Sequence, residues 1–242
     1  MPDTGSADAG KDTGDGRAAR WDSHRSDRQR QLLDAGIEAI EESGVNVGVR
    51  HVAERAGIPR SVVYRLFEDR DDFEEQLRAR IVEQLMTDLA PTLAPHGTLQ
   101  HAIHRAASTY VGWCADHPAL QQYVGLGTAS RQRGGSPTVT GTRTAIMATV
   151  AGLLSSACVR LGVAPRLAQP VANALYGLVD NTVNRWLARP DGMSRAELIE
   201  FLEVSIWNVI DGNLRHRGVI LDPTTLISDL RPEESVASTA AP

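Results

Sequence analysis

The chain has 242 residues, of which 42% are hydrophobic and 23% are charged, as in globular proteins large enough to bury a sizeable core. Its net charge of −5 excludes a uniformly basic nucleic-acid-binding protein. No apolar run approaches the length that spans a membrane, and the polar N-terminus lacks the apolar segment of a secretion signal. We therefore expect a cytoplasmic protein without a membrane anchor.

The charge is unevenly distributed along the chain. Residues 17–70 contain ten Arg against nine Asp and Glu, a net charge of +1, so the remainder of the chain carries −6. A protein of this kind can bind DNA through a locally basic surface while its acidic part stays away from the phosphates.

The first part of the chain is predicted to be unstructured up to a helix. Residues 1–25 are rich in Gly, Asp, Ser and Ala and are expected to form a disordered arm. The arginines of this arm continue to Arg30, and they are either a solvated tail or an arm that follows the DNA minor groove. Ser26 begins the first predicted helix, with Gln29 as its capping-box partner and Gly44 at its end.

Residues 49–67, VRHVAERAGIPRSVVYRLF, predict two short helices across a tight turn. Gly57 suits the left-handed conformation that ends the first helix, and Pro59 suits the first turn of the second. With the small Ala53 at the helix crossing, this order of residues is typical of a helix-turn-helix, although an ordinary αα-hairpin is the alternative. The second helix would read DNA with four polar side chains: Arg60, Ser61, Tyr64 and Arg65.

These two helices resemble the DNA-binding domain of TetR-type repressors. The resemblance is carried by the segments Arg50-His51-Val52-Ala53, Ala56-Gly57-Ile58 and Tyr64-Arg65-Leu66-Phe67, followed by Arg70. It implies that Arg70, which opens the next helix, and Arg50, near the start of the first, contact DNA phosphates. One departure is Gly48, where the family often has a Ser or Thr that caps the helix; Asn46 is the alternative cap.

A long helix is predicted to follow the helix-turn-helix. Asp69 can cap it, and it is expected to run to about Ala90, where Pro91 and Pro95 interrupt it. In the TetR family such a helix bridges the two domains and transmits ligand binding to the DNA-binding domain, and the resemblance implies the same role here. The predicted domains are a helix-turn-helix domain over 26–70, a helical ligand-binding and dimerisation domain over 71–221, and a disordered tail over 222–242.

The rest of the chain keeps the helical period and has almost no strand pattern, so the fold is predicted to be all-α. We expect helices over residues 99–117, 120–124, 146–162, 167–188 and 195–215. The last of these begins with a capping box formed by Ser194 and Glu197. Residues 127–141, GTASRQRGGSPTVTG, are predicted to be a loop.

The last two predicted helices are similar to the C-terminal pair through which TetR-type proteins dimerise as a four-helix bundle. Ala172, Ala174 and Gly177 would allow the close approach of a neighbouring helix, although an ordinary intrachain core is the alternative. A homodimer also fits the function, because one short recognition helix gives little specificity whereas a twofold dimer binds two half-sites.

A ligand pocket in the C-terminal domain is expected to be mostly apolar with a few polar groups. Candidates for these groups occur on otherwise apolar helices: Tyr110, Trp113, Tyr123, Asn173, Tyr176, Asp180 and Asn184. Asn173, Asp180 and Asn184 share one helix face, which would line either the pocket or a dimer interface. Each candidate can instead be an ordinary core or interface residue.

No motif of an enzyme is present in the sequence. The stretch 125–127 begins like a phosphate-binding loop but lacks its third glycine, and there is no His-Glu-x-x-His or nucleophile elbow. His101 and His104 share a helix face without a further ligand at matching spacing, so we expect no metal site and no cofactor. Cys114 and Cys158 stand on apolar helical patterns and are expected to be buried free thiols.

The sequence therefore predicts a homodimeric repressor of the TetR type, not an enzyme. It would bind an inverted repeat in double-stranded DNA and be released by a small, largely apolar molecule. Two alternatives remain: a DNA-binding regulator controlled by a protein partner instead of a small molecule, and an all-α enzyme.

Overall fold

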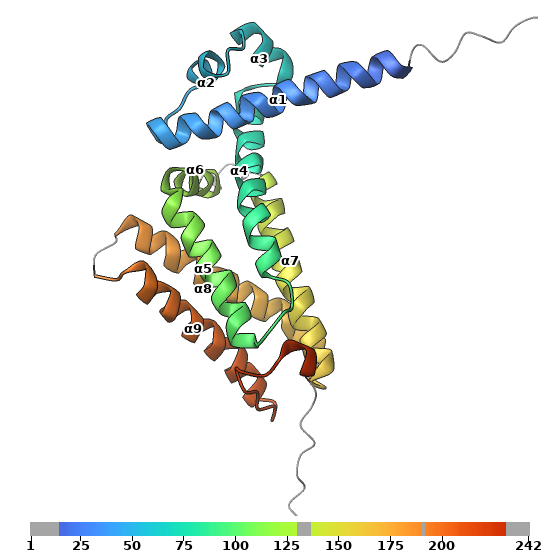
Figure 1. Ribbon diagram of the computed structural model, residues 1–242, viewed down its shortest axis with the longest axis vertical. Helices are drawn as coiled ribbons and strands as arrows, with labels where there is room; N and C mark the ends of the chain where they lie inside the picture. Colours follow the sequence, from blue (N-terminus) through green and yellow to red (C-terminus); the bar gives the residue numbers. More distant parts are fainter. Residues whose placement is uncertain (1–14, 130–136, 190–191, 231–242) are drawn as a thin grey trace, which may run out of the picture. The chain divides into compact units, whose positions relative to one another are not determined.

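The computed structural model describes residues 15–129, 137–189 and 192–230, and no strand occurs among them. The prediction of an all-α fold is confirmed. The helices are α1 (Asp15–Ser43), α2 (Val49–Arg55), α3 (Arg60–Leu66), α4 (Arg70–Thr92), α5 (Leu99–Asp116), α6 (Pro118–Ala129), α7 (Pro137–Arg160), α8 (Ala168–Ala188) and α9 (Arg195–Arg215), with the 3₁₀ turns η2 (Pro165–Leu167) and η3 (Ile227–Asp229) (Figure 1). The chain forms two units, and the boundary between them falls within α4, after Arg80.

The first unit contains a small core formed by the apolar faces of α1 to α4. Leu32 and Ile40 of α1 are fully buried, and Val63 of α3 is 2% exposed. Gly36 allows α1 and α4 to approach closely, because a Cβ atom there would lie 3.0 Å from the side chain of Leu77.

The second unit contains the larger core, in which α7 packs on α8 and α5 packs on α9. Val111, Val183 and Leu198 are fully buried, one each from α5, α8 and α9. Cys114 is a buried free thiol, as predicted, and its burial raises the pKa of the thiol to about 12. Cys158 is also buried and free.

Two parts of the chain are helical where the sequence predicted no regular structure. Helix α1 begins at Asp15, eleven residues before the predicted start at Ser26. The Ala- and Arg-rich stretch 17–20 consists of good helix formers, so the helix continues through the expected cap. Residues 1–14 of the predicted arm lie outside the described residues. Similarly, α6 reaches Ala129 and α7 begins at Pro137, so residues 127–129 and 137–141 of the predicted loop are helical and residues 130–136 lie outside the described part.

The predicted disordered tail over 222–242 is wrong for its first nine residues. Residues 222–230 include η3, and Leu221 and Leu230 are buried in a cluster with Leu161 and Leu214. These leucines do not follow a helical or strand period, so the sequence pattern did not reveal them as core residues. Residues 231–242 lie outside the described range.

Candidate DNA-binding surface and ligand cavity

The turn between α2 and α3 has the geometry of a helix-turn-helix. Gly57 has a φ of +64°, and the N–H of Ile58 donates to the carbonyl oxygen of Ala53 at 3.0 Å, which ends α2. Val63 and Leu66 are buried on one side of α3, so they fix which side of this helix faces outward. The sequence therefore determines both the turn and the exposed face of the second helix.

Replacing Gly57, the left-handed residue of the turn, is expected to destabilise the protein measurably. Gly57→Ala is expected to lower the free energy of unfolding by about 1–2 kcal/mol, because an L side chain is strained in this region of φ. Gly152→Ala is the matched control, since Gly152 lies within α7 with nothing within 4 Å of a Cβ atom, and this change should be neutral or stabilise by up to about 1 kcal/mol. Denaturant unfolding of both variants measures the difference; equal stability would show that the turn tolerates a side chain.

The outward face of α3 carries the four predicted recognition residues, Arg60, Ser61, Tyr64 and Arg65, all of which are exposed. The guanidinium of Arg60 donates to the hydroxyl oxygen of Tyr64 at 2.9 Å and lies 5.5 Å from the centre of its ring. Tyr64 is 54% exposed, which is unusual for an aromatic side chain in a domain with its own core. Two cations and an exposed aromatic ring on one face suit base edges and phosphates.

Arg50 and Arg70 flank this face and are exposed, but each has an acidic partner. Arg50 donates to Glu54 at 2.8 Å, and Arg70 donates to Glu74 at 2.8 Å. The hydrogen bond from Arg50 lowers the pKa of the Glu54 carboxyl. Exposed pairs of this kind contribute little to stability, so a phosphate can replace the carboxylate at small cost.

The start of α2 has no side-chain cap. Gly48 is the N-cap residue and makes no side-chain hydrogen bond, and Asn46 does not take over this role. The N-terminus of α2 therefore lacks the Ser or Thr cap that is frequent in the TetR family, as the sequence indicated.

Another arginine, Arg55, is held within the domain and does not belong to the recognition face. Its Nε donates to Glu38 at 3.0 Å and its Nη2 donates to Glu42 at 2.6 Å, which joins α2 to α1. The hydrogen bond from Arg55 lowers the pKa of the Glu42 carboxyl. This pair of contacts fixes the orientation of α2 beneath the turn.

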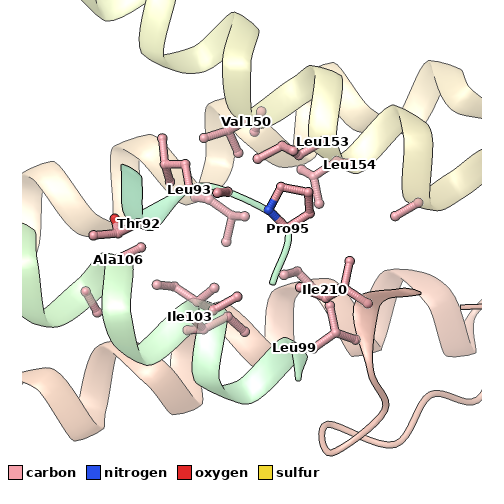
Figure 2. Close-up of a pocket in the computed structure, with 18 of the residues that line it drawn as sticks. Thr92, Leu93, Pro95, Leu99, Ile103, Ala106, Val150, Leu153, Leu154 and Ile210 are labelled. Atoms are coloured by element: carbon pink, nitrogen blue, oxygen red, sulfur yellow. The ribbon is translucent and has the colours of Figure 1, made fainter. Parts of the chain in front are cut away.

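The second unit contains a cavity of about 640 Å³, within the range of small-molecule sites. Its walls are formed by the C-terminal end of α4, by α5, α7, α8 and α9, and by residues after α9. Figure 2 shows Leu153 and Leu154 of α7 facing Ile103 of α5 across this space, with Leu99 and Ile210 near one end. Most of the lining side chains are apolar, and the polar ones are Thr92, Tyr110, Ser156, Arg160, Tyr176, Asp180 and Ser228.

Three of the predicted ligand contacts line the cavity: Tyr110, Tyr176 and Asp180. The hydroxyl of Tyr110 donates to a carboxylate oxygen of Asp180 at 3.4 Å, so the side chains of α5 and α8 meet there. Burial raises the pKa of the Tyr110 hydroxyl well above its usual value, and the neighbouring Cys114 and Asp180 add to this effect. Tyr110 is therefore protonated and acts as a hydrogen-bond donor at physiological pH.

The other predicted contacts do not line the cavity. Trp113 is buried and its ring lies 5.2 Å from that of His117, while Tyr123 is buried on α6. Asn173 is exposed and accepts a hydrogen bond from Gln169. The face of α8 that Asn173 shares with Asp180 is solvent-exposed near the start of the helix and half-buried further along.

Asn184 is also absent from the cavity wall. The side-chain oxygen Oδ1 of Asn184 accepts a hydrogen bond from Nε2 of Gln121 at 3.1 Å, which joins α8 to α6. Gln121 is a buried polar side chain, so this amide pair satisfies a polar group in the core.

Most of the cavity wall was visible in the sequence only as ordinary apolar periodicity. The stripe of Leu99, Ile103, Ala106 and Tyr110 on α5 reads as the buried face of a helix. Periodicity shows that a face avoids water, but it does not show whether a neighbouring helix or an empty space lies against it. The small size of Ala106 is the one local signal of room at this position.

Comparison with known proteins connects the first unit to a family. A model described as "Bacterial regulatory proteins, tetR family" matches residues 32–77, which extend from α1 through the helix-turn-helix into α4. The first unit carries the DNA-binding domain of the tetR family. Two curated relatives, both named as uncharacterised HTH-type transcriptional regulators of Mycobacterium tuberculosis, are 25% identical over 205 residues, which is 84% of this chain and 86% of theirs. The alternative of an enzyme is therefore wrong.

Solved structures show the same fold over both units. A transcriptional regulator from Rhodococcus sp. RHA1 is 23% identical, with a TM-score of 0.61, over 76% of this chain and 96% of that one. FadR from Bacillus subtilis, in complex with stearoyl-CoA, is 18% identical, with a TM-score of 0.58, over 76% of this chain and 98% of that one. At these identities the comparison concerns the fold.

The described residues contain no candidate for a membrane span or for a metal site. None of the helices is long and apolar enough to cross a membrane. In the same residues, no group of three or more His, Cys, Asp or Glu side chains lies together in a way that would hold a metal ion.

Proposed function

We propose that this protein is a repressor of the TetR type that binds an inverted-repeat operator as a homodimer and is released by a small, largely apolar molecule. The observation that carries this proposal is the apolar cavity in the second unit, whose wall includes α4, the helix that begins directly after the recognition helix. A regulator in the cytoplasm would meet both its operator and such a molecule.

The cavity favours an elongated apolar molecule with one polar end. Tyr110, Tyr176 and Asp180 are the polar groups on its α5 and α8 walls, and Asp180 accepts the hydrogen bond from Tyr110. A ligand group that donates, such as a hydroxyl, would suit this end better than an anion, because a carboxylate already lies there. The related fold of FadR holds stearoyl-CoA, which supports the capacity of such helical domains for long apolar chains.

The homodimer is proposed through α8 and α9. Phe201 and Val204 on α9 are 46% and 55% exposed, and Ala174 and Gly177 on α8 are also exposed. Large apolar side chains beside small ones allow two copies of a helix pair to pack closely. Two recognition helices related by a twofold axis would then bind the two halves of the operator.

Helix α4 would couple the cavity to the DNA-binding unit. The cavity is lined at the C-terminal end of α4 by Leu89 and Thr92, and just after this helix by Leu93. Near the start of α4, Phe73 and Leu77 belong to the core of the first unit. A ligand that binds one position of α4 more tightly than another shifts the population of the dimer toward a spacing that no longer fits the operator.

The first experiment is binding of the purified protein to its own upstream intergenic DNA, measured by footprinting at several salt concentrations. Protection of a short inverted repeat by an even number of chains is the expected result. Release of this complex by a homologous series of straight-chain alcohols would then test the ligand response. Specific binding by a single chain would contradict the dimer, and a complex insensitive to every compound that binds the cavity would contradict ligand control.

A further inference from the structure

The chain after α9 folds back over the second unit and forms a segment that we call the C-terminal strap, residues 219–230. It begins after Gly218, whose φ of +77° reverses the chain, and the N–H of Val219 donates to the carbonyl oxygen of Leu214 at 3.1 Å. The strap contains η3 and pairs with Thr98 through an isolated bridge at Leu226. It is thus an ordered element although the sequence predicted a disordered tail.

Backbone hydrogen bonds fasten the strap to the start of α5. The N–H groups of Gln100 and Leu99 donate to the carbonyl oxygens of Pro223 and Thr225 at 3.0 and 3.3 Å. The first N–H groups of a helix have no partner within it, so the strap supplies acceptors that α5 needs. On the other side, Arg160 of α7 donates to the carbonyl oxygen of Ile227 at 2.7 Å. The strap therefore joins the ends of α5 and α7.

The apolar side chains of the strap share one cluster but differ in whether they line the cavity. Leu221 is 7% exposed, lies in the cluster with Leu161, Val163 and Leu214, and does not line the cavity. Ile227 packs against the same cluster and also lines the cavity, as does Leu230. Leu221 therefore anchors the strap, and Ile227 forms part of the wall.

The wall position of the strap lies away from Tyr110 and Asp180, beside Arg160 and Ser228, which also line the cavity. The strap is bonded to α5 at Leu99 and Gln100, whereas Tyr110 lies eleven residues further along the same helix. At the rise of an α-helix, these residues are separated by about 16 Å. A ligand with its polar end at Tyr110 and Asp180 would therefore extend its apolar tail along α5 toward the strap.

We propose that the C-terminal strap is the end wall of the ligand site and that Ile227 sets the longest ligand chain that the site accepts. This inference rests on the proposed ligand function of the cavity. Because Ile227 is held through its own backbone by Gly97 and Arg160, the wall stays in place when the ligand is short. A tail long enough to reach this wall would clash with it and lose affinity.

The test is displacement of the fluorescent probe N-phenyl-1-naphthylamine from the full chain by straight-chain 1-alkanols, from octanol to octadecanol. For the wild type, each added carbon should raise affinity about fourfold while the tail remains in the cavity, and affinity should fall beyond a certain length. Ile227→Ala should move this limit to longer alcohols, and Ile227→Phe should move it to shorter ones.

Leu221→Ala is the matched control, because it removes an equally large side chain of the strap that does not line the cavity. It should lower stability and leave the length limit where it is in the wild type. An unchanged limit in both folded Ile227 variants would overturn the proposal while leaving the ligand function intact. If the wild type binds neither probe nor any alcohol, the ligand function fails and the end wall fails with it.

Discussion

Replacing Arg65 by alanine is expected to weaken operator binding by about 1–3 kcal/mol, or about five- to 150-fold. Arg65 is exposed on α3, on the side opposite the buried Val63 and Leu66. An arginine in this position can donate two hydrogen bonds to the major-groove edge of a guanine. Because such a contact depends on sequence, affinity for unrelated DNA should fall much less than affinity for the operator.

Two further variants make this result specific. Arg166→Ala removes an exposed arginine in η2 of the second unit and should leave DNA binding unchanged. Arg70→Ala should weaken binding to operator and unrelated DNA by similar factors and lower the slope of log affinity against log salt by about 1, as expected for a phosphate contact. Fluorescence anisotropy over a range of salt concentrations measures all three. A folded Arg65→Ala protein with wild-type affinity would remove Arg65 from the recognition residues.

The helix-turn-helix was predictable because its signals are local. Gly57 and Pro59 determine the backbone of the turn, and Val63 and Leu66 determine which face of α3 is buried, all within ten residues of one another. Such short-range patterns depend little on the rest of the chain. The recognition face follows directly from them, since residues at other positions of the helix must point outward.

The start of α1 and the strap were not predictable for two different physical reasons. A good capping box at Ser26 suggested a helix start, but a cap is only a preference, and helix formers before it allowed α1 to begin at Asp15. The strap depends on interactions between residues far apart in sequence, such as the hydrogen bond from Ile227 to Gly97 and the cluster that contains both Leu230 and Leu161. No local period encodes such pairings.

The cavity was predictable only in part. Part of its polar lining was predicted, because Tyr110 and Asp180 interrupt otherwise apolar helix faces. Trp113 and Asn173 interrupt such faces equally well, yet one packs in the core and the other is exposed. Which helix faces surround an empty space depends on how five helices are placed, and a single sequence does not contain that information in readable form.

Filling the cavity is expected to separate ligand response from DNA binding. Ala106→Phe adds a phenyl group to the wall of α5, at a position that Figure 2 shows beside Thr92 and near Ile103. Small-to-large changes in a packed core cost about 1–3 kcal/mol, but here the added group enters an existing space, so the protein should fold with little loss of stability. Affinity for a ligand in the cavity should fall at least 100-fold, since the two groups occupy the same volume.

The readout is operator binding with and without the alcohols that release the wild-type protein. Ala106→Phe should bind the operator with wild-type affinity and remain bound in their presence, whereas His101→Phe, an exposed change on the same helix, should be released normally. If Ala106→Phe were instead released from DNA without any ligand, the phenyl group would itself be acting as the ligand does, by displacing the end of α4 through Thr92. Either result links the cavity to the operator, and a variant that still responds like the wild type would place the effector site elsewhere.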